Sequence, residues 1–295
     1  MKYKKKPDLS LPLPNGESIA FNRIPKGRFM MGARGYEHDE EPVHEVEITE
    51  DFYLGIYPVT QAQFRAWTQA QSIKHENKFE GKDQHPAESL NWFEARQYCH
   101  WLMQLDNAHM IPDGFQARLP TESEWEYACS AWQETTAGRI YTEYHTGDGV
   151  GALQKAGWFG AFEDDNQRNV LDSSTQAAGL LTCNRHGLYD MHGNVWEWCL
   201  DAYVPGRYSV SPRLCCDPFC AGEKGSKADP CTLPLDVPVN EDGGYRVRRG
   251  GSWDLHATDC RAAFRDRILP VFRVRYPGFR VGLFPVPCQP EQPDQ

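Results

Sequence analysis

Apolar and polar residues alternate along three short stretches of the chain. The pattern runs through HEVEITEDFYLG at 44–55, YRVRRGGSW at 245–253 and GFRVGLF at 278–284. Successive side chains of a strand point to opposite faces, so this period of two predicts strands with one buried face. Gly, Pro, Asn and Asp interrupt most other segments, which predicts short strands and long connections.

Three helices are predicted by the residues of their first turns. Thr60, Asn91 and Thr121 are each followed, three positions later, by Gln or Glu. Such a pair can close a capping box, in which each side chain bonds the backbone N–H of the other residue. The second helix also carries an apolar stripe suited to a core, formed by Ala95, Tyr98, Leu102 and Leu105.

These elements predict a loop-rich α+β domain with few helices and no internal repeat. Residues 1–18 are expected to form an N-terminal tail, and the Pro- and Gln-rich residues 286–295 a C-terminal tail. One domain is left over residues 19–285. Within it, 145–185 and 201–243 are expected to be irregular insertions, since loops of that length are commonly functional or disordered.

Charge and composition exclude several classes of function. The chain has 295 residues, of which 40% are hydrophobic, enough for a substantial core. Its net charge of -10 argues against nucleic acid or an anionic membrane as a partner. The basic N-terminus is not followed by an apolar stretch, and no segment has the length of a transmembrane helix. We therefore expect no signal peptide, no lipid anchor and no membrane insertion.

Ten cysteines in a chain without an export signal predict reduced thiols and a cytoplasmic protein. Four of them fall in CCDPFCAGEKGSKADPC, namely Cys215, Cys216, Cys220 and Cys231. A zinc site is one interpretation of this cluster. An irregular loop with ordinary thiols is favoured, because the spacing is not a pair of Cys-x-x-Cys knuckles and no histidine is nearby.

Several longer phrases follow one another in a fixed order. They are GRFMMG, EEPVHEVEITEDFYLGIYPVTQAQF, HPAESLNWFEARQYCHWL, ARLPTESEWEYAC, HGLYDMHGNVWEW, RVRRGGSW, CRAAFR and GFRV. From about residue 22 to 284 the chain resembles the formylglycine-generating-enzyme, or sulfatase-modifying factor, family. The resemblance implies a C-type-lectin-like fold with small antiparallel sheets, few helices and long irregular loops.

The same phrases contain residues suited to holding irregular loops. The tryptophans of EWEY and VWEW are large apolar groups with one N–H. Gly193 and Asn194 suit a tight turn. Arg118 and the arginines of RVRRGG are expected to bond backbone carbonyls and carboxylates.

The resemblance implies a comparison with the oxygen-dependent enzymes of this family, in which two C-terminal cysteines hold copper(I). Copper(I) favours thiolate ligands. The second of these positions is Cys260 here, but the first is Leu255. One thiolate cannot form a linear copper site, so no copper is expected, and Cys260 is interpreted as a buried thiol. Whether the chain is an enzyme stays open, with the balance against it.

No other catalytic motif is evident. The iron-dependent relatives carry an extra N-terminal helical domain with histidine ligands, for which we expect no counterpart here. The chain's histidines lack HxxxH or HxH spacing, and neither a GxSxG elbow nor a phosphate-binding loop occurs. These histidines include His38, His44, His85, His186 and His192.

One metal remains an expectation from the resemblance. The turn before WEW is similar to a structural calcium site of the family. The matching positions are Asp190, Gly193, Val195 and Glu197. Main-chain oxygens with a carboxylate are calcium ligands. In the alternative interpretation, Glu197 braces the turn by accepting backbone hydrogen bonds.

Residues 254–280 lack Lys, Glu, Gln, Met and Trp altogether, although the chain uses all five elsewhere. Codons that begin as AAC or AAT and change only at adenine can never encode these five residues. They can encode Asp, Leu, His, Phe, Ile, Val, Arg and Tyr. Relatives of the family often have Asn at many positions of this segment, so the absences match adenine-specific rewriting.

The segment therefore resembles the variable region of a diversity-generating retroelement, placed at about 250–284. Two sets of residues result. The frame set matches the family: Cys260, Arg261, Ala262, Arg265, Arg267, Pro270, Arg273, Gly278, Phe279 and Arg280. The variable set replaces the Asn positions: Asp254, Leu255, His256, Asp259, Phe264, Asp266, Ile268, Leu269, Phe272, Val274, Arg275 and Tyr276.

This resemblance implies a non-catalytic binder whose variable set faces solvent and contacts a macromolecule, which we expect to be a protein. Exposed together, its apolar members would form a patch typical of a binding site. Three alternatives stay open. The apolar residues could be the core of the last strands, the chain could be an oxidoreductase acting around Cys260, or it could be a non-catalytic scaffold subunit.

Overall fold

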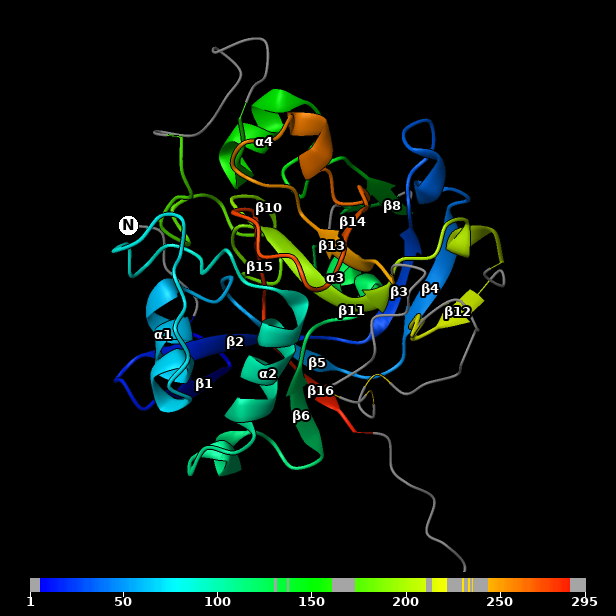
Figure 1. The fold of residues 1–295 in the computed structure, drawn as a ribbon. Coiled ribbons are helices and arrows are strands. Elements are labelled where there is room, and N and C mark those ends of the chain that lie inside the picture. Colours follow the sequence, from blue (N-terminus) through cyan, green and yellow to red (C-terminus); the bar gives the residue numbers. More distant parts are fainter. Residues whose placement is uncertain are drawn as a thin grey trace, which may run out of the picture.

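The computed structural model describes most of the chain, and every structural statement below refers to that part. The described residues are 6–129, 132–136, 138–160, 173–210, 214–221, 230, 233, 235 and 244–286. Curled sheets and four α-helices are linked by long irregular segments (Figure 1). The helices are α1 Gln61–Ala70, α2 Trp92–Leu102, α3 Glu122–Cys129 and α4 Val150–Ala156.

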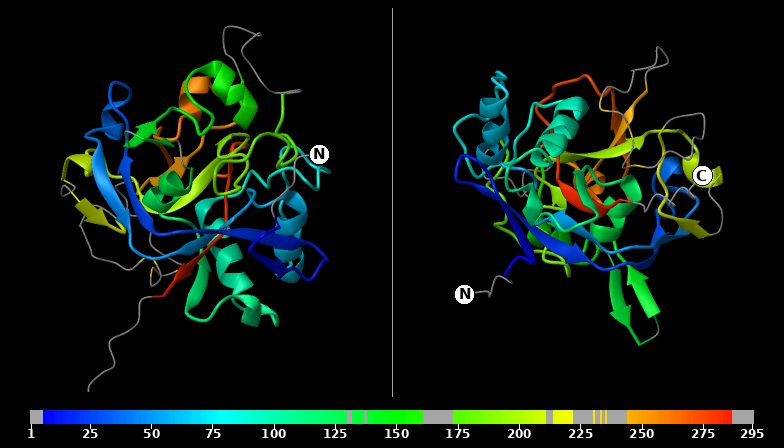
Figure 2. Two further views of the ribbon diagram at one scale, coloured as in Figure 1. Left: turned by 180° about the vertical axis from the view of Figure 1, so that it is seen from behind. Right: turned by 90° about the horizontal axis from the view of Figure 1, so that it is seen from below.

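One half of the molecule is built on a five-stranded sheet of order β1-β2-β5-β16-β6, with α1 and α2 beside it (Figures 1 and 2). All its pairings are antiparallel. The strand β16, near the C-terminus, lies between β5 and β6, which come much earlier in the chain. The strands are β1 Leu9–Pro12, β2 Ser18–Ile24, β5 Phe52–Gly55, β6 Phe115–Arg118 and β16 Gly282–Pro285.

The other half contains a four-stranded sheet of order β14-β13-β11-β15, which carries the candidate surface. A three-stranded sheet of order β12-β4-β3 and two short pairs, β9 with β10 and β7 with β8, surround it (Figure 1). The strands are β3 Gly27–Met31, β4 His44–Ile48, β7 Trp132–Thr135, β8 Gly138–Tyr141, β9 Gly157–Trp158, β10 His192–Gly193, β11 Trp196–Ala202, β12 Leu214–Cys216, β13 Arg246–Arg249, β14 Asp266–Ile268 and β15 Pro277–Gly278.

The three predicted helix starts are confirmed. Thr60 and Asn91 both close capping boxes on the first turns of α1 and α2. Before α3, the backbone N–H of Thr121 donates to Glu124 at 2.7 Å while Thr121 Oγ1 accepts from the Glu124 N–H at 3.2 Å. The stripe on α2 is buried at Ala95, Tyr98 and Leu102, as predicted, whereas Leu105 lies beyond the end of the helix and is half-buried. The three alternating stretches supply β4 with β5, β13, and β15 with β16.

The N-terminal tail was predicted too long. Residues 9–12 form β1, which pairs antiparallel with β2, and Leu11 is fully buried. The apolar residues of LSLPL pack into the main core, which outweighs the loop-like Pro and Gly content around them. The expected C-terminal tail lies almost entirely outside the described residues.

The two expected insertions are more ordered than their composition indicates. α4 and β9 lie within 145–185. Within 201–243, β12 pairs parallel with β4. The seven-residue helix α4 and the three-residue edge strand β12 are too short for periodicity alone to reveal them.

Candidate ligand-binding surface

The segment 250–284 winds across one side of the molecule as loops around a few short elements. It leaves β13 through Gly250 and Gly251, both with positive φ, and enters a 3-10 turn at Ala257–Cys260. It then forms β14, a loop, β15 and finally β16 (Figure 1). Loops of this kind, held on a rigid sheet, are a common location of binding residues.

Buried arginines hold this segment to the rest of the fold. Arg261 makes two hydrogen bonds to the Glu40 carboxylate, at 2.9 and 2.7 Å. Arg265 binds Glu122 in the same way, at 2.6 and 2.8 Å. All four side chains are buried, and a buried charge is tolerated only with such a partner. The fork geometry fixes the position of each loop, not only its charge balance.

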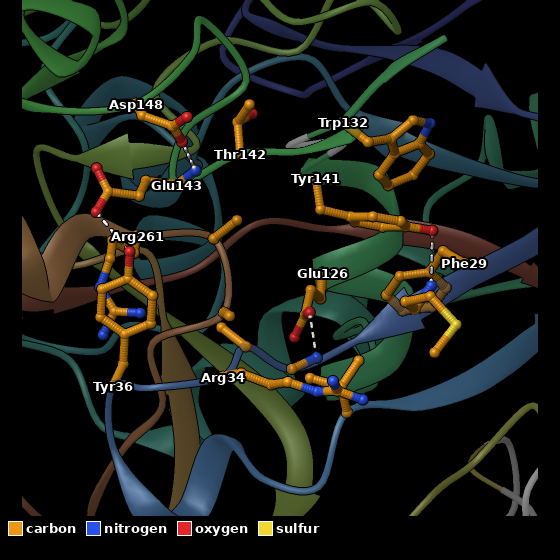
Figure 3. A pocket seen from close by; sticks show the side chains of 16 residues that line it. Phe29, Arg34, Tyr36, Glu126, Trp132, Tyr141, Thr142, Glu143, Asp148 and Arg261 are labelled. Atoms are coloured by element: carbon orange, nitrogen blue, oxygen red, sulfur yellow. Dashed lines mark hydrogen bonds between the residues drawn. The ribbon is translucent and has the colours of Figure 1, made fainter. Parts of the chain in front are cut away.

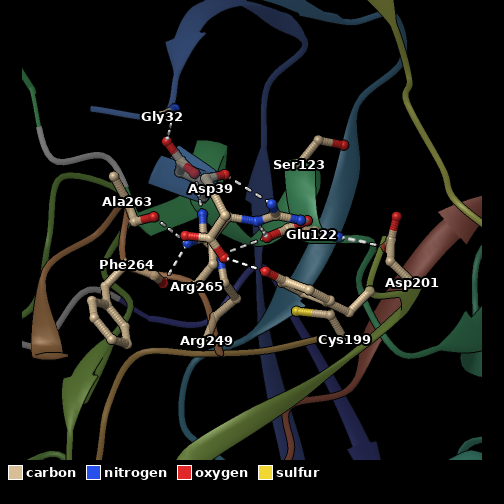
Figure 4. A network of polar contacts seen from close by, with 12 residues as sticks. Gly32, Asp39, Glu122, Ser123, Cys199, Asp201, Arg249, Ala263, Phe264 and Arg265 are labelled. Atoms are coloured by element: carbon tan, nitrogen blue, oxygen red, sulfur yellow. Dashed lines mark hydrogen bonds and ion pairs between the residues drawn. The ribbon is translucent and has the colours of Figure 1, made fainter. Parts of the chain in front are cut away.

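A third arginine, Arg249 of β13, joins the network from beneath (Figure 4). It donates to the carbonyl of Ala263 at 2.7 Å and to the carbonyl of Phe264, and it forms an ion pair with Glu126. The prediction that arginines of RVRRGG and Arg118 brace carbonyls and carboxylates is therefore confirmed, since Arg118 also pairs with Glu124.

The pKa values of the acids in this network reflect two opposing effects. Burial raises them, and pairing with an arginine lowers them. Burial raises the pKa of Glu126 to about 7, although Arg249 opposes the shift. Burial also acts to raise the pKa of Glu122, but Arg265 and Arg249 outweigh it and hold that pKa below its usual value. Glu122 thus remains the anionic centre on which the two arginines converge.

The frame set and the variable set separate by burial. Eight of the ten frame residues are buried, the exceptions being Arg267 and Arg273. None of the twelve variable residues is buried. Three are exposed, His256, Phe272 and Arg275, and the other nine are half-buried: Asp254, Leu255, Asp259, Phe264, Asp266, Ile268, Leu269, Val274 and Tyr276.

Two tryptophans outside the variable set support its members from below. The ring of Phe264 packs on Trp196, with centroids 6.0 Å apart. The ring of Tyr276 lies 6.4 Å from that of Trp253, and the Arg275 guanidinium lies over the Trp253 ring at 5.6 Å. Aromatic platforms of this kind hold a changeable side chain in place without specifying its identity.

Residues far away in sequence form a second wall beside the variable set. An open groove runs between Val274, Arg275 and Tyr276 on one side and the segment 76–80 with Ser89 on the other. Phe79 attaches that segment by packing edge-on against Trp253, with centroids 5.4 Å apart. The sequence gives no signal for this wall, because the contact joins positions more than 170 residues apart.

The alternative of a strand core does not fit most of the apolar variable residues. Phe272 and its neighbour Val271 are each 47% exposed. Leu269 and Val274 are half-buried, and only Ile268 packs partly against the main core. The alternation in RILPVFRVRY is incomplete because only the first residues of the stretch belong to a strand.

Cys260 is fully buried beneath this surface. Burial raises the pKa of its thiol far above the usual value, and the nearby Asp259 adds to the shift. A buried protonated thiol is a poor metal ligand and a poor nucleophile. Its setting agrees with the interpretation of Cys260 as a packing residue.

His192 is also buried, beside His145. The two rings stack with centroids 5.0 Å apart, and His192 Nδ1 lies 2.8 Å from the carbonyl oxygen of Cys260. Burial lowers the pKa of His145 to about 4 and that of His192 to about 3. Both rings are therefore neutral at pH 7 in the folded protein, and they form part of the support of the loop that carries Asp259 and Cys260.

This pair predicts a loss of stability in acid. Between pH 6.5 and 4 the unfolded chain binds protons at these histidines while the folded chain does not, so stability falls as pH falls through that window. We expect His145→Gln to reduce the loss between pH 7 and pH 5 by about 1–2 kcal/mol relative to the unmodified protein. Urea unfolding at both pH values measures it. Equal losses in the two proteins would contradict the prediction, because all other titrating groups are shared.

In the turn at 190–197, the Glu197 carboxylate is held by side-chain donors rather than by the backbone N–H groups of the bracing interpretation. One carboxylate oxygen accepts from Trp125 Nε1 at 2.7 Å, and Arg280 donates to both oxygens at 3.1 and 2.7 Å. Asp190 Oδ2 accepts from the backbone N–H of Gly179 at 2.7 Å. The Arg280 guanidinium thus neutralises the Glu197 carboxylate. Calcium at Asp190, Gly193, Val195 and Glu197 stays a prediction.

The cysteine cluster is only partly within the described residues, because Cys231 lies outside them. In β12, Cys215 packs against the core whereas Cys216 is exposed, with its Sγ 3.8 Å from Glu47 Oε2. Neighbouring residues of a strand point to opposite faces, so these two thiols do not converge on one ion.

No helix in the described ranges is long and apolar enough to span a membrane.

The fold and the buried frame set are those of a domain of the formylglycine-generating-enzyme type. A family model, the sulfatase-modifying factor enzyme 1-like domain, matches residues 12–282. The chain belongs to this family, which confirms the resemblance and, with the solved structures, the α+β lectin-like fold.

Relatives of several kinds are similar to the chain. Serine/threonine-protein kinase pkn1 of Chlamydia caviae is 28% identical over 268 residues, covering 84% of this chain but only 35% of the kinase. Formylglycine-generating enzyme of Streptomyces coelicolor is 28% identical, with 88% of this chain and 87% of the enzyme covered. Among solved structures, Treponema denticola variable protein 1 superposes with a TM-score of 0.69 at 22% identity, covering 92% of this chain and 97% of that one.

Proposed function

We propose that this chain is a non-catalytic binding protein whose variable set contacts a macromolecular ligand, a protein. In this proposal the variable set is the diversified surface of a diversity-generating retroelement. The free thiols throughout the described residues fit a reducing, cytoplasmic setting. Similarity in fold to a variable protein of Treponema denticola supports the proposal at the level of architecture.

The observation that carries the proposal is the agreement between two independent partitions of one segment. Resemblance to the family divides residues 254–280 into frame positions and positions where relatives often have Asn, without reference to this structure, and codon chemistry accounts for the residue types at the second set. Burial divides the same positions in nearly the same way. A mechanism that rewrites side chains is compatible with folding only where those side chains carry little of the core packing.

The chemistry of the surface suits a protein ligand. Phe272 and Tyr276 offer aromatic area with few rotatable bonds, which is typical of binding hot spots. Asp254, His256 and Arg275 supply charge that tunes specificity. The constant wall at 76–80 adds Glu76, Lys78 and Glu80, all exposed, so a ligand in the groove would meet fixed and variable residues together.

The direct test is the DNA downstream of the gene. We expect a near-copy of the segment that codes for 250–284, differing almost only at adenines, followed by a reverse-transcriptase gene. Without such a copy the missing residue types are a coincidence. The alternative of oxidation around Cys260 would then be tested by metal reconstitution with copper or iron.

A matched pair of libraries tests the surface itself. In the first, the codons of the twelve variable residues are randomised with a pyrimidine third base. In the second, the eight buried frame residues are treated in the same way. The twelve variable residues are exposed or half-buried, and substitutions at exposed positions change stability by about 0.5 kcal/mol each, whereas those at buried positions cost several times more. We expect most members of the first library to fold and few of the second.

Display of both libraries against hen egg-white lysozyme as a probe completes the experiment. The first library should yield binders whose affinity falls when position 272 or 276 is replaced with alanine. Equal fractions of folded protein in the two libraries, or binders whose contacts map elsewhere, would argue against a variable binding surface.

A further inference from the structure

A second pocket opens next to the frame residues 261–263 and is lined by none of the residues of the groove at 274–276. It has a volume of about 340 Å³ and lies between β3, the loop that follows it, β8 with the turn to Asp148, and residues 261–263 (Figure 3). None of the twelve variable residues lines it. A volume of this order suits a small molecule rather than a protein surface.

Three aromatic rings form one wall of this pocket. Trp132 stacks on Phe29 with centroids 6.1 Å apart, and Tyr141 lies 6.0 Å from Trp132. Ala262 and Ala263 line it from the buried frame. Small side chains here leave space beside flat rings, the arrangement that accommodates a planar apolar body.

Hydrogen bonds at the rim hold these walls in place without a ligand. Tyr141 Oη accepts from the backbone N–H of Met30 at 2.8 Å. Tyr36 donates its hydroxyl to Glu143 at 2.8 Å, and its ring lies under the Arg261 guanidinium at 3.7 Å. A pocket that is already ordered loses little conformational freedom on binding.

The charges of the pocket are satisfied with one exception. Arg261 is paired with Glu40, and Glu126 with Arg249. Glu143 and Asp148 accept backbone N–H groups at 2.6 and 2.8 Å. Arg34 is exposed at the pocket's edge, across from Asp148 and Thr142 in Figure 3, and has no ion pair within the described part of the chain. It is the cation available to a ligand.

We propose that this pocket binds a small planar aromatic molecule that carries a carboxylate, with its rings against Phe29, Trp132 and Tyr141 and its carboxylate on Arg34. A guanidinium binds a carboxylate through two parallel hydrogen bonds, which gives preference over a neutral group of equal size. The pocket and the variable set share no lining side chain, although Arg261 of the pocket lies over the ring of the variable residue Phe264, 5.7 Å from its centroid.

Calorimetric titration with 2-naphthoate and with its neutral amide, 2-naphthamide, tests the pocket in the full-length protein. We expect the acid to bind at least about tenfold more tightly than the amide, the effect of one charge-assisted contact. Arg34→Gln should remove that preference while leaving the affinity for the amide unchanged. Arg28→Gln, which removes an exposed cation of β3 that does not line the pocket, should leave both affinities unchanged.

Filling the pocket provides the second arm. Ala263→Phe should abolish binding of both compounds by occupying the space beside the rings. Should that variant not fold, Arg34→Gln decides alone, since an exposed side chain can be replaced with little effect on folding. Failure of both compounds to bind, or a preference for the acid that persists in Arg34→Gln, overturns the proposal. Neither result bears on the variable surface.

Discussion

Replacing Arg280 with methionine is expected to lower the free energy of unfolding by about 3–5 kcal/mol, as for other broken buried ion pairs. Arg280 is fully buried and binds both oxygens of Glu197, which is itself only 1% exposed. The same side chain donates to the carbonyls of Gly55 and Tyr189, each at 2.8 Å. The variant leaves a buried carboxylate and two carbonyls without their donor.

Arg28→Met is the matched control for this experiment. Arg28 also binds a glutamate, Glu47, at 3.0 Å, but both side chains are substantially exposed. Water replaces a lost surface partner, so the expected loss is below about 1 kcal/mol. Denaturant titration of both variants measures the difference. Similar losses in the two would show that the Arg280 pair does not hold the fold together.

Gly251→Ala is expected to cost about 3 kcal/mol or more, from two sources that add. The residue has a φ of +75°, which is unfavourable for alanine. An added Cβ would also lie 2.5 Å from Cys260 Sγ and 2.9 Å from the carbonyl oxygen of Asp259. The 3-10 turn that carries Asp259 would have to move, and the variable loop with it.

Gly114→Ala separates these two contributions. Gly114 has a φ of +77°, and nothing lies within 4 Å of an added Cβ. Only the backbone term remains, so the expected cost is about 1–2 kcal/mol. Equal costs at the two glycines would mean that the turn at Cys260 adapts freely. The close packing of Gly251 against Cys260 and Asp259 would then place no constraint on the segment that carries the variable residues.

Local features of the fold were predictable because they depend on neighbouring residues. The capping boxes at Thr60, Asn91 and Thr121 involve positions three apart, and the strands at 44–55 follow from alternation. β1 was missed for the same reason. β1 is held in place by the packing of Leu11 in the main core, which the neighbouring residues do not reveal. A four-residue strand with Pro and Gly around it has no local signature of burial.

The candidate surface divides along the same line. The family resemblance, together with the missing residue types, predicted the variable set from sequence, and the structure leaves every member at least partly accessible. The constant wall at 76–80 and the pocket beside Arg34 had no sequence signal. Each depends on segments brought together by the fold, Phe79 with Trp253 in one case and β3 with residues 261–263 in the other.

The sequence alone was enough to recognise the family, three helix starts and the strands of the three alternating stretches, and to predict the loss of one copper-ligand position at Leu255 and the variable set. Only the tertiary structure decided how the buried charges are paired. Arg280 with Glu197, and Arg261 with Glu40, join residues 83 and 221 positions apart. That pairing shows which cation neutralises the Glu197 carboxylate in this structure. A carboxylate's role follows from which cation the fold places against it, and a list of residues does not contain that distance.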